Sequence, residues 1–198
     1  MENNVTQLYQ QGLSARAVGE KLGVSTKSVY SLLKRKGIPR RSAKQANHVR
    51  FQQTELSFTI PKRLTLDERR LCVCALALYW GEGAKTLAAG LTDIANSDVK
   101  ILRVFLRYLR EILHVDKTRL RVYLYCFEDQ DVLALCRYWS KELDIPTGQF
   151  QKPHVRPCAN KQKGRIMQYG VAHVRYADRR LQAYVLQEIE KIKIWAGT

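Results

Sequence analysis

The chain has 198 residues, of which 45% are hydrophobic, so it can bury a core. Its 34 Lys and Arg residues outnumber 18 Asp and Glu residues, and the net charge of +16 attracts phosphate backbones or anionic membrane surfaces. No apolar run approaches the roughly 20 residues of a membrane span, and the polar start MENNVTQ lacks the order of a signal peptide. We therefore expect a cytoplasmic, nucleoid-associated protein that binds nucleic acid and no membrane.

The cysteines and histidines do not indicate a shared metal site. The five cysteines include no CxxC pair that would hold zinc, and the four histidines are scattered. We interpret the histidines as structural. We expect the cysteines to be reduced and mostly buried; they are Cys72, Cys74, Cys126, Cys136 and Cys158.

The first fifty residues carry ten basic and two acidic residues and contain three short helical patterns. Apolar spacing predicts a first helix that stops at Gly12. A second helix is capped by Ser14 and ends at Gly23, and a third is capped by Ser25 and ends near residues 36–37.

Residues 13–41, LSARAVGEKLGVSTKSVYSLLKRKGIPRR, contain what two helices crossing at a sharp turn need, with Gly19 where they touch and Gly23 in the turn. The segment resembles the helix-turn-helix of resolvases, transposases and many bacterial regulators. The resemblance implies that the third helix enters a DNA major groove and that the basic residues after it hold phosphates. The alternatives are an ordinary helical hairpin and, for GIPRR, a solvated linker. The residues expected to contact DNA are Ser25, Thr26, Lys27, Ser28, Tyr30, Ser31, Lys34, Arg35, Lys36, Arg40 and Arg41.

The remaining text mixes helical and strand patterns, which predicts the α+β class. We expect a small all-α helix-turn-helix domain over 1–41, a basic linker or arm over 42–63 and an α+β domain over 64–198. Within the last, the patterns predict helices near 66–81, 98–113, 130–145 and 178–194, and strands near 86–95, 118–127, 148–155 and 168–177.

The first helix of this larger domain ends unusually. The segment LCVCALALYWGEGAK is largely apolar and ends in Gly-acid-Gly. Ala77 and Gly81 lie four residues apart on one face, where small side chains let two helix backbones approach closely. Glu82, between two glycines, is in an odd place for a charge unless it faces solvent or a cation.

The segment ALALYWGEG, residues 75–83, resembles the motif of the LAGLIDADG homing-endonuclease family. Ala77 stands at the family's packing glycine, Gly81 at its small position, Glu82 at its metal-binding acid and Gly83 at its final glycine. The following TDIANSDVKILRVFLRYLREILHV resembles the family's strand, turn and helix, and the resemblance extends loosely over 66–194. Two positions depart from the motif, because Trp80 replaces an acidic residue and Glu82 replaces the usual Asp.

The resemblance implies a saddle-shaped sheet lying on DNA, with the motif helices of two copies packed along a two-fold axis. Because the chain has one motif, it would act as a homodimer with Ala77 and Gly81 at the interface and a Mg²⁺ ion at each Glu82. Lys152 would assist at the cleaved phosphate. The sequence thus predicts sequence-specific binding and Mg²⁺-dependent cleavage of double-stranded DNA. The alternatives are a non-catalytic transcription regulator with the same fold and, less favoured, a recombinase or transposase accessory protein.

Residues 145–177 contain six basic residues and no acidic one, which predicts a surface facing phosphate. A solvated basic loop is the alternative. The residues expected on the DNA side are Gln149, Gln151, Arg156, Lys161, Lys163, Arg165 and Arg175.

Overall fold

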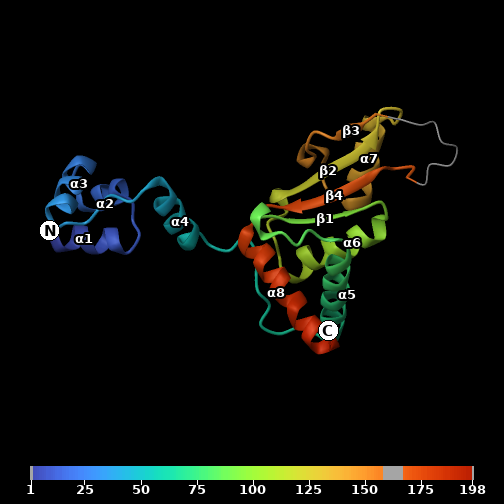
Figure 1. Ribbon diagram of the computed structural model, residues 1–198, viewed down its shortest axis with the longest axis horizontal. Coiled ribbons are helices and arrows are strands. Elements are labelled where there is room, and N and C mark those ends of the chain that lie inside the picture. The colour runs from blue at the N-terminus through green and yellow to red at the C-terminus, as the bar shows by residue number, and fades with distance from the viewer. Residues whose placement is uncertain (1, 158–166, 198) are drawn as a thin grey trace. The chain divides into compact units, whose positions relative to one another are not determined.

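The computed structural model describes residues 2–157 and 167–197, and it divides into two compact units, residues 1–55 and 56–198. The predicted α+β class is confirmed, because N-terminal helices precede a four-stranded mixed sheet packed with helices (Figure 1). No helix in the described ranges combines the length and apolar character needed to cross a membrane.

The first unit contains four helices, of which three share a small core. The predicted caps are the ones observed: the Ser14 and Ser25 hydroxyls accept hydrogen bonds from helix amides, and Gly23 adopts the left-handed φ of 67° that the turn requires. A Cβ on Gly19 would lie 2.5 Å from the Val24 carbonyl oxygen, so the helix crossing needs a glycine there. The helices are α1 (Glu2–Gln10), α2 (Ala15–Leu22), α3 (Thr26–Arg35) and α4 (Ala43–Gln53).

Helix α4 occupies part of the segment in which the sequence predicted a linker. It begins with a capping box between Ser42 and Gln45, but none of its side chains is buried. It therefore lacks the apolar periodicity by which the other helices were predicted. The Gln53 Nε2 donates a hydrogen bond of 2.7 Å to the Gln11 carbonyl, which holds the helix against the turn after α1.

The second unit alternates helices and strands in the predicted order. The strands predicted near 86–95 and 148–155 are shorter than expected, because 3₁₀ turns at Leu87–Ala89 and Thr147–Gln149 occupy part of each segment. A π-helical turn, Tyr108–Ile112, continues the helix Val99–Arg107. The elements are α5 (Leu66–Glu82), β1 (Thr92–Asn96), α6 (Val99–Arg107), β2 (Leu120–Phe127), α7 (Val132–Leu143), β3 (His154–Arg156), β4 (Val171–Tyr176) and α8 (Arg179–Ala196).

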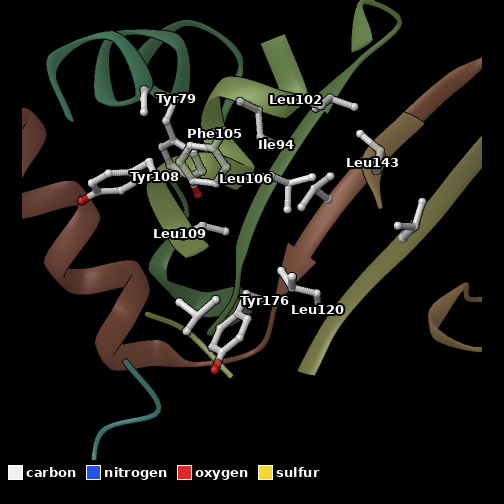
Figure 2. Close-up of a cluster of buried hydrophobic side chains, with 14 of the residues drawn as sticks. Tyr79, Ile94, Leu102, Phe105, Leu106, Tyr108, Leu109, Leu120, Leu143 and Tyr176 are labelled. Carbon is white, nitrogen blue, oxygen red and sulfur yellow. The ribbon is translucent and has the colours of Figure 1, made fainter. Parts of the chain in front are cut away.

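The sheet has the strand order β1-β4-β2-β3, with β4 antiparallel to both neighbours and β3 parallel to β2. Alternate residues of β1, β2 and β4 are buried in one cluster with side chains of all four helices, so the helices cover one face of the sheet. Figure 2 shows part of this core, including the Tyr79 and Phe105 rings, which stack with their centroids 5.0 Å apart. The other face of the sheet remains uncovered by these helices.

Candidate nucleic-acid interface

Helix α3 presents a polar surface. Thr26, Lys27, Ser31 and Lys34 are exposed, and no acidic residue lies in the helix. The hydroxyls of Ser25 and Ser28 lie 2.8 Å apart, and Ser25 also caps the helix. Two of the serines predicted to contact DNA are therefore already engaged with each other.

The basic residues at the end of α3 and after it differ in their intramolecular contacts. Glu2 accepts a hydrogen bond of 2.7 Å from Arg35 and lies 3.7 Å from the Lys36 ammonium. The Arg40 guanidinium lies over the half-buried Tyr30 ring, 4.7 Å from its centroid.

Arg41 has a structural role that the sequence did not predict. Its guanidinium lies 4.1 Å from the Tyr9 ring centroid and donates hydrogen bonds to the carbonyls of Tyr9, Gly12 and Leu13. These contacts hold the segment before α4 against the end of α1. We therefore assign Arg41 a role in the structure of this unit, and the phosphate contact that we expected of it stays a prediction.

We call the uncovered side of the sheet the open face. Along each strand, every second residue points away from the helices. The strand register places these residues next to one another on the open face. Three of them are arginines and one is an aspartate, so the face is basic and rich in rings. The open face comprises Asp93, Ala95, Arg121, Tyr123, Tyr125, Phe127, His154, Arg156, Val171, His173 and Arg175.

Asp93 organises one end of the open face. Its carboxylate lies 3.0 Å from the His173 Nδ1 and accepts a hydrogen bond of 2.8 Å from the Arg175 Nε. Arg175 in turn lies over the Tyr123 ring, 4.5 Å from its centroid. This cluster was not predicted from the sequence, because Asp93 is 80 residues from His173 and only the pairing of β1 with β4 brings them together.

Tyr125 is the centre of a second cluster on the open face. The rings of His154 and His173 each have their centroid 4.9 Å from that of Tyr125, and the Arg156 guanidinium lies 5.4 Å from it. A hollow of about 290 Å³ borders this cluster and is also lined by Phe127. Rings beside cationic groups are typical of surfaces that meet nucleic acid.

The other residues predicted from 145–177 lie in different settings. The Gln149 Nε2 donates hydrogen bonds of 2.8 and 2.7 Å to the Lys117 and Leu120 carbonyls, so this amide is engaged within the fold. Gln151 and Lys152 are exposed before β3. Arg156 and Arg175 lie on the open face, and Lys161, Lys163 and Arg165 lie outside the described residues.

Glu82 is exposed at the end of α5, where Tyr79 fixes the path of the chain into β1. The Tyr79 hydroxyl donates a hydrogen bond of 2.8 Å to the Ala84 carbonyl and accepts one of 3.3 Å from the Asp93 amide. Burial raises the pKa of the Tyr79 phenol to about 12, so it keeps its proton. A Cβ on Gly83 would lie 2.5 Å from the Tyr79 ring, which explains the glycine after Glu82.

Ala77 and Gly81 lie on an exposed face of α5. Val73 on the same side is 46% exposed, Cys74 is also exposed, and nothing lies within 4 Å of where a Gly81 Cβ would be. We call residues 73, 74, 77 and 81 the α5 face. No other described side chain covers the site where the sequence predicted a helix contact with a second copy.

The expectation that the cysteines are mostly buried is wrong. Of the four described cysteines, all of them free thiols, only Cys126 is buried. Cys74 is exposed because it belongs to the α5 face, while Cys72 and Cys136 are half-buried at the edge of the core. Cys158 lies outside the described residues.

The residues predicted to be catalytic are not neighbours within one chain. Glu82 precedes Gly83, which bridges to Ile94 on β1, whereas Lys152 follows Gln151, whose amide bonds to Val122 on β2. Strand β4 lies between β1 and β2, and Gly83 and Gln151 pair with the outer sides of β1 and β2, so four interstrand spacings, roughly 19 Å, separate their backbones in the sheet direction. In the part of the chain that the structure describes, no three His, Cys, Asp or Glu side chains gather as metal ligands.

Comparison of the chain with protein-family models, with curated proteins and with solved structures gives no significant match.

Replacing Tyr79 by Phe tests whether its phenol holds α5 to β1. The substitution removes both hydrogen bonds and leaves the Ala84 carbonyl without this partner, so we expect the free energy of unfolding to fall by about 1–3 kcal/mol. Urea unfolding followed by circular dichroism measures the change. Tyr123→Phe is the matched control, because that hydroxyl makes no hydrogen bond to a described residue. Equal stability of both variants would contradict a role for the Tyr79 hydroxyl.

Proposed function

We propose that the chain is a sequence-specific double-stranded DNA-binding protein that uses α3 and the open face. The observation that carries this proposal is the surface of α3. The helix follows α2 across the Gly23 turn and exposes Thr26, Lys27, Ser31 and Lys34 without a neighbouring acidic side chain in the helix. Hydroxyls and ammonium groups on a helix after such a turn are suited to base edges and phosphates in a major groove.

The open face supports the same function independently. It carries arginines beside tyrosine and histidine rings, and its single carboxylate, Asp93, is engaged with His173 and Arg175. A phosphate near this face therefore meets little negative charge. A saddle-shaped sheet lying on the duplex, as in the LAGLIDADG family, is the arrangement we propose for this unit.

The double substitution Lys27→Ala with Ser31→Ala tests base recognition by α3. A preferred site is first selected with wild type from a random duplex pool, and fluorescence anisotropy then compares that site with a scrambled one. We expect the selected site to lose at least about tenfold in affinity, while the scrambled site changes little, because base contacts are worth about 1–3 kcal/mol each. Lys21→Ala on α2 is the control. An unchanged ratio between the two sites would contradict recognition by α3.

The second candidate function is Mg²⁺-dependent cleavage by a homodimer, favoured by the exposure of Glu82 directly beside the α5 face. Mg²⁺ commonly binds one or two carboxylates together with water and substrate phosphates. Glu82 fits as one such ligand, and a second copy and the DNA would have to supply others. Bound there, Mg²⁺ would activate water and stabilise the leaving oxygen of a phosphodiester. A regulator that binds and never cuts is the alternative.

The dimer in this proposal packs the α5 face against the same face of a second copy, as a two-fold axis requires. Exposed Cys74 then lies near its counterpart, so a short bis-maleimide should join two chains. We expect a dimer band on a denaturing gel for wild type and its loss in Cys74→Ser. Gly81→Arg should also abolish it, because a large charged side chain occupies the contact. Cross-linking that persists in both variants would place the interface elsewhere.

Replacing Glu82 by Gln separates cleavage from regulation. In an endonuclease, the substitution should lower cleavage of the selected site by at least about 100-fold with Mg²⁺ and leave the dissociation constant measured in EDTA within a factor of about three. A sequencing gel with labelled duplex measures cleavage, and wild type in EDTA is the uncut control. A site that wild type binds but never cuts with Mg²⁺ would favour the regulator.

A further inference from the structure

A basic cleft lies in the first unit between α4 and the helices α1 to α3. Its volume is about 560 Å³, and its walls come from α2, from the end of α1, from Tyr30 on α3 and from the α4 segment. All the charged side chains that line it are arginines, namely Arg40, Arg41 and Arg50. We call this hollow the α4 cleft.

The positive charge of the α4 cleft is not cancelled locally. Arg41 donates to backbone carbonyls, which satisfy its N–H groups but carry no net charge. Arg40 lies on the Tyr30 ring, and Arg50 is exposed on α4. Among the described residues, no carboxylate pairs with any of the three, and the sequence has no Asp or Glu from Lys21 to Thr54. A cleft of this kind attracts an anion.

Helix α4 contributes one cation, Arg50, to the cleft and no side chain to a core. An isolated helix of 11 residues is marginal in water, and none of its side chains is buried. Its position depends on the contact between Gln53 and Gln11 and on the adjoining Arg41. Arg50 lines the cleft together with residues of α2, and Tyr30, which also lines it, belongs to the helix that we propose to read DNA.

We propose that the α4 cleft binds a backbone phosphodiester of the duplex whose major groove receives α3, with Arg40 and Arg50 as its ligands. Guanidinium groups suit this role, because their planar N–H donors match the oxygens of a phosphate. The inference rests on the proposed DNA binding and deepens it. It adds α4 and Arg50 to the interface as a contact that holds the duplex without reading its sequence.

The test measures how duplex affinity depends on salt in the full chain. Fluorescence anisotropy gives dissociation constants for the selected site and a scrambled site between 50 and 300 mM KCl. The variants are Arg50→Gln and Arg40→Gln with Arg50→Gln. Arg50→Lys keeps the charge, and Arg16→Gln is the matched control, because Arg16 is exposed, pairs with Glu20 and does not line the cleft.

Each lost phosphate contact should lower the slope of log Kd against log[KCl] by about one, so we expect a fall of about one for Arg50→Gln and about two for the double variant. Affinity should fall by the same factor for both duplexes, and the ratio between them should stay constant. Arg50→Lys should retain the wild-type slope, as should Arg16→Gln.

Two results would overturn the inference in distinguishable ways. If wild type binds duplex DNA and the double variant keeps the wild-type slope, the cleft does not hold a DNA phosphate, although the proposed function stands. If wild type binds no duplex at 50 mM KCl, both the function and the inference fail. Titration of wild type with inorganic phosphate, followed through the Arg50 side-chain NMR signal, distinguishes a DNA phosphodiester from free phosphate as the ligand. If the signal shifts while the double variant keeps the wild-type slope, the cleft binds only the free anion, and the inference is again overturned.

Discussion

The end of helix α5 depends on the buried ring of Tyr79. The ring stacks on Phe105 and lies where a Cβ on residue 83 would be, so the chain can leave the helix past it only with a glycine. Its hydroxyl then ties the next residues to β1 through the Ala84 carbonyl and the Asp93 amide. Glu82 is exposed because the helix ends at this point. Asp93 contacts Tyr79 through its backbone and His173 through its side chain, so the same tie reaches the open face.

The open face exists because four helices share one side of the sheet. Burial of alternate strand residues against these helices leaves the other set on the opposite face of the sheet, where polar groups bond with one another. The Asp93 carboxylate is the hydrogen-bonding partner of the His173 ring and the Arg175 guanidinium. The open face is therefore less basic than its three arginines imply, because Asp93 pairs with Arg175.

Local features were predictable from the sequence because their causes are local. Ser14, Ser25 and Gly23 form caps within a few residues of their partners, and apolar spacing located α5 to α8. The exposure of Glu82 agreed with its setting between two glycines. Helix α4 was not predicted because it has no apolar face. The contacts that hold it are distant in sequence: Gln53 bonds to Gln11, 42 residues away, and Arg41, just before the helix, bonds to Gly12, 29 residues away.

The contacts that the sequence did not predict join residues that are far apart in the chain. Asp93 and His173 carry no local pattern that links them, and Gln149 looked like a polar strand residue although its amide bonds to carbonyls near β2. Strand register decides the first case, and the second depends on a 3₁₀ turn, Thr147–Gln149, that replaces part of the expected strand. The order β1-β4-β2-β3 does not follow the order of the strands in the chain, so a sequence pattern alone could not supply it.

The net charge of +16 is the excess of 34 Lys and Arg residues over 18 Asp and Glu residues, and the intramolecular contacts of each cation decide how readily a phosphate can bind it. The Arg35–Glu2 pair is exposed, and such pairs contribute about 0–1 kcal/mol, so a phosphate of the proposed DNA ligand would displace Glu2 at little cost. Arg175 and Asp93 are largely buried, and separating them would leave an unpaired charge inside the cluster. Arg41 is bound to three carbonyls whose loss would release the segment before α4. In the proposed DNA complex, phosphates should therefore recruit Lys27, Lys34, Arg40 and Arg50 most readily and Arg35 next. Arg41 and Arg175 should be recruited least readily, because they support the surfaces that the others present.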